Sequence, residues 1–520
     1  MRARYHGEPL TLAEKKALPF KKAGPGTVPS FGFMFGKLSE NAANRLPEGQ
    51  ATIDALRDLG IAMAEDPSNA ESGIPAAYTY FGQFIDHDIT KTVFDASLQP
   101  PAGPDPIEAA SFQPVAAAQV TGLIQNARTA PLDLDSLFGG LAAGTVGKDG
   151  TMALGDVSPA PFGTIPTADK KHDLPRKPMI LNPTTPEEEE ADRQALIGDP
   201  RNDENLLVAQ LHVGFIGAFN ALVRRGEPNP QTALRRRYQW AVMHDFLPRI
   251  GLNRVVNDVL ANGPKVWQVG KAADLFMPIE FAAAAYRFGH SMIRGSYSHN
   301  QTFDPAGFNF FFTFTALSGD LLPGQGHNTQ SPTLPDNWVI EWQRFFGSAA
   351  SPASFNPARR IDANLTPALG LLRDFEGVPN AGIMAHLAAR NLLRGYLLGL
   401  PTGQAVAKQL GIAPLPVEVL RAATPSGLGQ SIEAAGLLTR TPLWFYILAE
   451  AGDSRPNGPD GQSLGEIGTR IIAETLWNMA KFATDSVIDK PPSDADLATG
   501  EYTLKGIIKL GLDRQLAGVP

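Results

Sequence analysis

The sequence predicts a mainly α-helical protein: one large domain with long loops and little β-structure. Three observations predict this class. Several long segments carry apolar residues at helical spacing, alternating strand patterns are scarce and short, and the 51 glycines and 44 prolines are spread between the apolar segments. With 520 residues the chain is long enough to bury a large core, and it contains no repeat of fixed period.

The chain divides into an N-terminal arm and a single domain. Residues 1–70 are polar and punctuated by proline and glycine, so we expect an arm that packs on the domain of residues 71–520. The expected helices are residues 76–90, 203–225, 230–247, 279–293, 381–398 and 464–483. The expected loops are residues 98–119, 140–170 and 318–358.

The composition excludes several classes of site. Because the chain has no cysteine, it cannot contain disulfides, thiolate nucleophiles, iron–sulfur clusters or thiolate-bound haem. The net charge of -8 and the lack of a basic stripe argue against nucleic-acid binding. No signal peptide and no membrane-spanning run is expected, which leaves cytoplasmic residence or export without a cleaved signal.

Polar side chains interrupt the first expected helix. Residues 83–88 read QFIDHD, and the residues just before them are largely aromatic. One interpretation is a helix face that meets solvent. The aromatic neighbours favour burial instead, and because buried Asp86 and His87 would need partners, the run is a candidate site.

A charged turn precedes the second expected helix. In residues 198–204 (GDPRNDE), glycine and proline form the turn. Asn202 or Asp203 is expected to cap the helix by accepting hydrogen bonds from its first amides. Capping leaves Arg201 and Glu204 without an explanation.

Three more segments carry residues that can bind a metal or an anion. Residues 286–290 (YRFGH) follow an apolar run, where a histidine is more often a satisfied core residue than a ligand. Residues 389–395 (ARNLLRG) are by themselves an ordinary helix end. Residues 129–136 (TAPLDLDS) can surround a hard cation or form a solvated acidic turn.

Taken together and in this order, the five segments resemble the animal-type haem peroxidases of the peroxidase–cyclooxygenase superfamily, in particular their bacterial members. The family's motifs GQ-x-x-DHD, LD-x-x-S-x-x-G, GD-x-R-x-x-E, R-x-GH and N-x-x-RG stand here at residues 82–88, 132–139 (in the variant LDLDSLFG), 198–204, 287–290 and 391–395. The resemblance spans about residues 75–485. It implies a helical fold around a buried haem b, with hydrogen peroxide as oxidant and a halide, pseudohalide or small aromatic molecule as donor.

The resemblance implies three catalytic residues. His87 would be the base that takes the proton of peroxide, a task suited to a neutral histidine. Arg201 would be the cation that stabilises charge as the O–O bond breaks, although a structural salt bridge is the alternative. Gln83, one helical turn from His87, would contact a halide, with a simple surface amide as the alternative.

The resemblance also implies the cofactor contacts. His290 would bind the haem iron, and its other ring nitrogen would donate a hydrogen bond to the amide oxygen of Asn391. Arg287 would pair with a haem propionate. The remaining cofactor-binding residues would be Arg394 and, through ester bonds to the haem, Asp86 and Glu204.

A calcium ion is the second cofactor that the resemblance implies. Its oxygen ligands would be Asp88, Thr129, Pro131 through its carbonyl, Asp133 and Asp135. Such an ion would fix the helix that carries His87, as a structural support rather than a redox centre.

Two other functions stay open: a fatty-acid dioxygenase on the same fold, and a non-catalytic haem-binding protein. The presence of both His87 and Arg201 argues against the second. In dioxygenases of the superfamily a radical-forming tyrosine stands three residues before the iron ligand, and Arg287 occupies that position here. The adjacent Tyr286 is expected to face elsewhere, because one residue rotates a helical side chain by about 100°.

Overall fold

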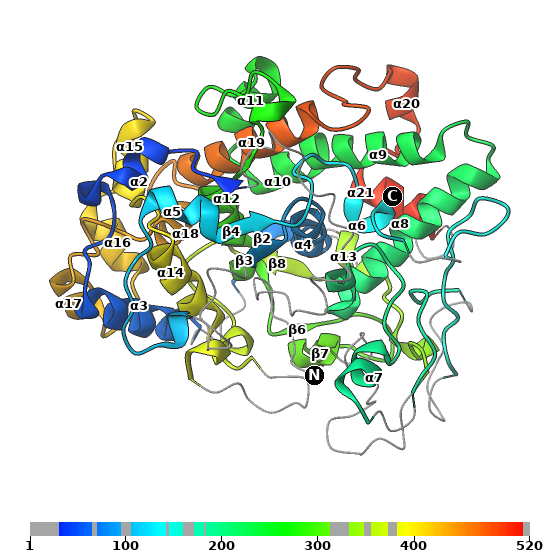
Figure 1. Cartoon of the computed structure of the whole chain (residues 1–520), viewed down its shortest axis with the longest axis horizontal. Coiled ribbons are helices and arrows are strands. Elements are labelled where there is room, and N and C mark those ends of the chain that lie inside the picture. Colours follow the sequence, from blue (N-terminus) through cyan, green and yellow to red (C-terminus); the bar gives the residue numbers. More distant parts are fainter. Residues whose placement is uncertain are drawn as a thin grey trace.

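Helices form most of the structure, as the sequence predicts (Figure 1). The computed structural model describes residues 31–64, 70–94, 106–141, 145–159, 171–180, 184–312, 332–347, 355–372 and 382–512. Within these ranges the β-structure consists of four two-stranded sheets and a few isolated bridges. Parts of the three expected loops lie outside the described residues.

The bounds of the elements are as follows. The longer α-helices are α3 (Gln50–Met63), α4 (Ala77–Ile89), α5 (Ala117–Leu123), α8 (Leu206–Arg224), α9 (Pro230–Ala241), α11 (Asn253–Asn262), α14 (Leu387–Leu397), α15 (Gly403–Gln409), α16 (Val417–Ala423), α18 (Leu443–Ala451), α19 (Glu466–Lys481) and α21 (Leu504–Gly511). The shorter ones are α2 (Gly36–Glu40), α6 (Asp135–Phe138), α7 (Pro186–Ala191), α10 (Leu247–Ile250), α12 (Ile279–Ala283), α13 (Gln343–Phe346), α17 (Gly429–Ala434) and α20 (Asp494–Ala498). The strand pairs are β1 (Phe31–Gly32) with β5 (Met277–Pro278), β2 (Glu71–Pro75) with β8 (Pro357–Arg359), β3 (Thr92–Phe94) with β4 (Ile124–Asn126), and β6 (Ser296–Tyr297) with β7 (Ala306–Gly307).

Helix α8 lies in the core because it is apolar on nearly every face. Asn205 caps its first turn, with Oδ1 accepting from the Val208 amide at 3.1 Å. It contacts α4, α9 and α21. By length and composition alone α8 could cross a membrane, but 89% of the relevant window is buried against the rest of the protein, as in the core helix of a folded domain.

Helices α8 and α21 cross at glycines. A Cβ at Gly217 would lie 2.4 Å from the carbonyl oxygen of Gly511, and one at Gly511 would lie 2.1 Å from the carbonyl oxygen of Gly214. Larger residues at these positions would therefore force the two helices apart. This contact joins the C-terminal helix to the centre of the core.

The described part of the N-terminal arm is more regular than the sequence analysis expected. It contains α3, which packs against α14, and a Cβ at Gly60 would lie 2.3 Å from the Cα atom of Ala389. The carboxylate of Glu280 accepts hydrogen bonds from the amides of Met34 and Phe35, both at 2.9 Å. These contacts dock the arm on the helices that carry the candidate site.

Two of the expected helices are interrupted. The segment expected at residues 279–293 is α12 followed by a 3₁₀ helix, η6 (Ala285–Met292). The segment expected at residues 230–247 is α9 followed by a π-helical turn, η4 (Val242–Phe246), and then by α10. Irregular turns of this kind occur often beside functional sites.

Candidate active site

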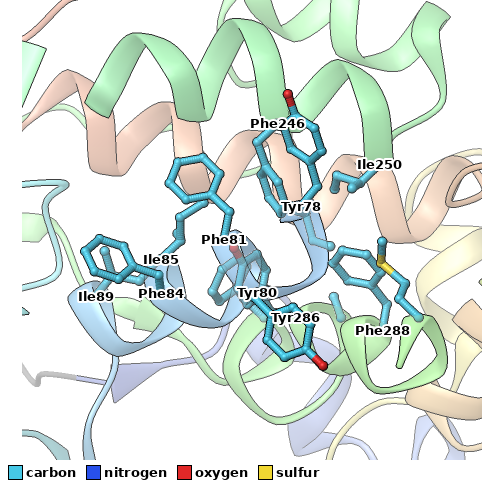
Figure 2. Packing of buried hydrophobic residues seen from close by; sticks show 14 of the residues in the cluster. Tyr78, Tyr80, Phe81, Phe84, Ile85, Ile89, Phe246, Ile250, Tyr286 and Phe288 are labelled. Atoms are coloured by element: carbon cyan, nitrogen blue, oxygen red, sulfur yellow. The ribbon is translucent and has the colours of Figure 1, made fainter. Parts of the chain in front are cut away.

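Helix α4 holds three consecutive polar residues inside the protein. Asp86, His87 and Asp88 are all buried, and because successive residues are about 100° apart they point in different directions. The aromatic face of α4 anchors the helix: Phe84 stacks on Phe215 of α8 at 4.6 Å between ring centroids. Figure 2 shows Phe84 within the cluster of aromatic side chains that line α4.

A chain of hydrogen bonds fixes the orientation of His87. Its Nδ1 atom donates to Oδ1 of Asn202 at 2.8 Å, and Nδ2 of Asn202 donates to Nδ1 of His212 at 2.9 Å. Burial lowers the pKa of His212 to about 3, so this ring is neutral and accepts the bond. The lone pair of His87 is therefore on Nε2, which lies 3.8 Å from Oε2 of Glu204. That is the arrangement a general base requires.

Arg201 anchors the end of α4. Its guanidinium forms a salt bridge with Asp199, at 2.7 Å from Nη2 to Oδ2. The same Nη2 donates to the carbonyl oxygens of His87 at 2.9 Å and of Thr90 at 2.6 Å. The structural salt bridge considered as the alternative is thus present, and Arg201 does not line the cavity described below. Its role as the cation beside peroxide stays a prediction.

The expected cap at Asn202 or Asp203 is wrong. Asp199 caps the 3₁₀ helix η3 (Pro200–Asp203) by accepting from the Arg201 amide, and Asn205 caps α8. Asp203 forms an ion pair with Arg176, and Asn202 bridges the two buried histidines. Several side chains of this turn are of types that can cap a helix. Which of them caps and which bonds to His87 depends on how α4 packs against the turn.

Gln83 and Glu204 lie on the wall of one cavity. Nε2 of Gln83 donates to Oε2 of Glu204 at 3.5 Å, and Oε1 of Gln83 accepts from Nδ2 of Asn205 at 3.0 Å. Asp86 lines the same wall. Gln83 is therefore half-buried on the cavity wall with both amide atoms bonded, and its contact with a halide stays a prediction.

Replacing Glu204 by glutamine is expected to change how stability depends on pH. Burial raises the pKa of Glu204 from 4.5 to about 8, although Arg201 and Arg390 oppose the shift. In the cofactor-free protein the folded state keeps this proton while the unfolded chain releases it. The wild type should therefore lose free energy of unfolding as the pH rises between these two values, and Glu204→Gln should not share this loss.

Urea unfolding of both cofactor-free proteins across that pH range measures the difference. Other buried carboxyls with raised pKa, such as Glu280 and Glu450, titrate in both proteins and cancel. Parallel stability curves for the two proteins would contradict the assignment of Glu204 as a protonated buried acid.

His290, on η6, lines the same cavity. Its Nδ1 atom is 2.9 Å from Nδ2 of Asn391, while Oδ1 of Asn391 accepts from Nη1 of Arg287 at 3.2 Å. The expected bond from His290 to the amide oxygen is therefore reversed here. The physical reason is that a guanidinium can only donate, so Arg287 occupies the oxygen and leaves the amide nitrogen for His290.

Positive charge is concentrated near His290. The pKa of Arg287 is lowered to about 10: burial is the main cause, Asp86 opposes it, and the nearby Arg394 and Arg390 contribute to the lowering. Guanidinium groups pair well with carboxylates, so this region could receive a carboxylate of a ligand. A carboxylate ligand that attracts Arg287 would also free Oδ1 of Asn391 to accept from Nδ1 of His290, which leaves Nε2 able to bind a metal.

Tyr286 lines the cavity, so the expectation that it faces elsewhere is wrong. Its hydroxyl is buried and has no hydrogen-bond partner among the described residues. The expectation assumed a regular α-helix with the cavity on one side. Instead η6 is a 3₁₀ helix, and the cavity borders most of its faces, including Phe288, Gly289 and Met292.

The cavity between α4 and η6 has a volume of about 100 Å³, and it continues into a wider space of about 860 Å³ that includes open solvent. A Cβ added at Gly289 would meet no atom within 4 Å, so open space lies directly beside His290. The remaining wall is apolar and includes Phe308, Phe312 and Leu387. Haem requires a site with an iron ligand, nearby cations for its propionates and apolar walls. The residues around this cavity supply these groups, so they fit haem.

The five expected calcium ligands are only partly brought together. Asp88 accepts from the amide of Ser136 at 3.0 Å, and Thr129 donates to Asp135. Asp133 turns away and accepts from the Thr484 amide at 2.7 Å. Among the described residues no group of three or more acidic or histidine side chains could hold a metal as they stand.

Two details of this loop bear on cation binding, although Arg235 already lies 3.7 Å from the carboxylate of Asp133. Burial raises the pKa of Asp88 to about 7, and Asp135 adds to the shift. The carbonyl of Pro131 accepts only a local bond, from the Asp133 amide at 2.9 Å. A bound cation would lower the pKa of Asp88 again, because it favours the ionised form of nearby carboxylates.

Comparisons with known proteins support the same fold. No protein-family model matches the chain, and no curated protein matches it in sequence. Its structure is similar to that of peroxidase A from Dictyostelium discoideum, at 18% identity and a TM-score of 0.56, over 90% of this chain and 89% of that chain. It is also similar to the fatty acid alpha-dioxygenases of Oryza sativa and Arabidopsis thaliana.

Both dioxygenases are 14% identical to this chain, with TM-scores of 0.51. The Oryza sativa comparison covers 88% of this chain and 79% of that one, and the Arabidopsis thaliana comparison covers 94% and 77%. At such identities the likeness establishes architecture rather than activity. The chain shares its mainly helical fold with these peroxidase and dioxygenase structures.

Proposed function

We propose that the protein is a haem peroxidase that uses hydrogen peroxide to oxidise halides, pseudohalides or small aromatic donors. The observation that carries the proposal is the orientation of His87: Asn202 accepts its Nδ1 proton, so the lone pair on Nε2 is directed toward Glu204 at the wall of the cavity that His290 borders. A base and an iron ligand are the two groups that peroxide cleavage needs. His87 itself is fully buried and does not line the cavity, so in this proposal it acts next to Glu204, which does.

Each side chain has a part in this reaction. Haem would be held by His290, with Arg287 and Arg394 on its propionates, and would supply the two-electron chemistry of peroxide reduction. His87 takes a proton from peroxide at Nε2 and returns it to the leaving oxygen. Arg201 is the nearby cation in this proposal, and Gln83 contacts the donor from the cavity wall.

A screen of donors tests the proposal. With haem bound and peroxide added, iodide, bromide, thiocyanate and a phenol are each offered, and oxidation of at least one should exceed that of free haem. Oxidation of none of them, by protein that binds haem, would favour the non-catalytic haem-binding alternative.

A fatty-acid dioxygenase is the second candidate, and Tyr286 is the observation that favours it. Tyr286 lines the cavity, part of whose wall is apolar, and its buried hydroxyl has no hydrogen-bond partner among the described residues. We rank it second because Tyr286 stands four residues before His290, not three. Incubation with an unsaturated fatty acid and O₂ decides: stereospecific oxygenation that is lost in Tyr286→Phe would replace the peroxidase proposal.

Covalent attachment of the haem is expected through Asp86 and Glu204. Both carboxyls line the cavity, where ester bonds to haem methyl groups could form in the presence of peroxide. Acid–organic extraction after peroxide treatment should leave haem on the wild type and less on Asp86→Val or Glu204→Gln. Complete extraction from the treated wild type would contradict this expectation.

Calcium is the remaining cofactor that we propose. Elemental analysis should find about one calcium per chain, because Asp133 and Asp135 are close in the sequence and the Ser136 amide holds Asp88 against the same loop. Removal by a chelator should lower both stability and peroxidase activity, since Asp88 lies beside His87 on α4. Metal-free protein of undiminished stability and activity would defeat the proposal.

A further inference from the structure

Tyr78, in the first turn of α4, connects the cavity to a buried carboxylate. The residue is 3% exposed and lines the cavity wall. Its hydroxyl donates to both oxygens of Asp245, at 2.8 Å to Oδ2 and 2.9 Å to Oδ1. A phenol at the edge of the candidate site therefore has a proton acceptor already in place.

The π-helical turn η4 places Asp245 beneath this phenol. The same carboxylate accepts from Nε of Arg249 at 2.9 Å and from the Leu504 amide at 2.9 Å. The Arg249 side chain is 44% exposed, and its guanidinium carbon lies 4.5 Å from the centre of the Tyr78 ring. Three side chains in contact thus lead from the cavity to solvent.

The hydrogen bond to Asp245 matters because of how phenols are oxidised. A phenol that loses an electron becomes a very strong acid, so oxidation is easiest where a base can take the proton in the same step. Burial raises the pKa of Tyr78 above its usual range, and the charge of Asp245 adds to this, so the phenol stays protonated until it is oxidised. Tyr286, on the same cavity wall, has no such partner among the described residues.

We propose that Tyr78 is a one-electron relay between the cavity and the protein surface, with Asp245 as its proton acceptor. The proposal rests on the peroxidase function, because the peroxide-oxidised haem is the oxidant that takes the electron. The phenolic O–H bond breaks, the proton passes to an oxygen of Asp245, and a neutral tyrosyl radical remains. An external donor then returns one electron, and the proton passes back from Asp245 to the phenol oxygen.

Radical trapping tests the relay. The haem-loaded protein is mixed with hydrogen peroxide, the absorption of the haem is recorded, and samples are frozen for EPR or treated with a nitroso spin trap and mapped by peptide mass spectrometry. We expect a tyrosyl signal and a trap adduct on Tyr78 in the wild type. Both should be lost in Tyr78→Phe, and lost in Asp245→Asn, whose amide keeps an oxygen that accepts a hydrogen bond but not a proton.

Tyr446→Phe is the matched control, because this buried hydroxyl accepts from the Leu415 amide at 2.6 Å and does not line the cavity. It should keep the full signal. If the haem reacts with peroxide but no adduct forms on Tyr78 of the wild type, the relay is overturned and the peroxidase proposal is not. This outcome is measured on the wild type, so it does not depend on whether a variant folds. A haem whose absorption does not respond to peroxide overturns the peroxidase proposal and the relay with it.

Discussion

Replacing His290 by alanine should abolish the Soret band that the wild type shows after haem reconstitution. In a protein without cysteine the iron needs a nitrogen or oxygen ligand, and His290 borders the open space beside Gly289. Its Nδ1 atom has a polar partner in Asn391, which leaves Nε2 to bind the iron once the Asn391 amide has turned. Absorption titration with haem measures the effect.

His244→Ala is the matched control, since His244 is exposed and stacks on Trp240, at 3.7 Å between ring centroids. It should bind haem like the wild type. His290→Gly leaves room for an external ligand, so added imidazole should restore part of the band. A His290→Ala variant with normal haem spectra and affinity would show that the axial ligand has been wrongly assigned.

Replacing His87 by alanine should leave haem binding intact and slow the reaction with peroxide by about 10²–10⁴-fold, the range that one general acid–base group contributes. The side chain is fully buried and bonded to Asn202, so its effect comes through proton transfer at Nε2. Stopped-flow absorption of the haem after mixing with peroxide gives the rate. An unchanged rate in His87→Ala would remove the base from the mechanism.

Arg201→Ala should also weaken the reaction, and a second measurement separates its two possible roles. If Arg201 acts as a cation beside peroxide, the rate falls more than stability does. If it acts only through the carbonyls of His87 and Thr90, thermal unfolding of the cofactor-free variant falls as well, because α4 loses its anchor. His244→Ala again supplies the reference.

The sequence was sufficient where local periodicity decides the structure. Helices α4, α8 and α19 begin and end within a few residues of their expected bounds, because each carries a long apolar pattern. Helix α3 was missed although Ile53, Leu56 and Leu59 follow helical spacing, because residues 1–70 were interpreted as a polar arm punctuated by proline and glycine. For residues 50–63 the helical spacing was the better guide than the local composition.

The site was predictable only as far as residue types allow. Gln83, Asp86, Glu204 and His290 were expected around one cofactor, and all line one cavity. Asn391 was expected beside His290, whereas the partners of Gln83 and Glu204 were not expected, since they depend on tertiary contacts. Asn202 was interpreted as a helix cap, whereas it bonds to His87. The direction of the Tyr286 side chain was inferred from α-helical geometry, whereas residues 285–292 form a 3₁₀ helix.

The glycine crossing of α8 and α21 has a consequence for how the protein is made. During synthesis α8 leaves the ribosome long before residues 504–511 exist, so its apolar surface must wait for a partner that is translated almost last. The contact of α3 with α14 imposes a similar delay on the N-terminal side. Contacts between such distant segments slow folding and expose aggregation-prone surface to solvent. Chaperone binding to nascent chains that end before residue 504 should therefore be stronger than to the released, full-length protein.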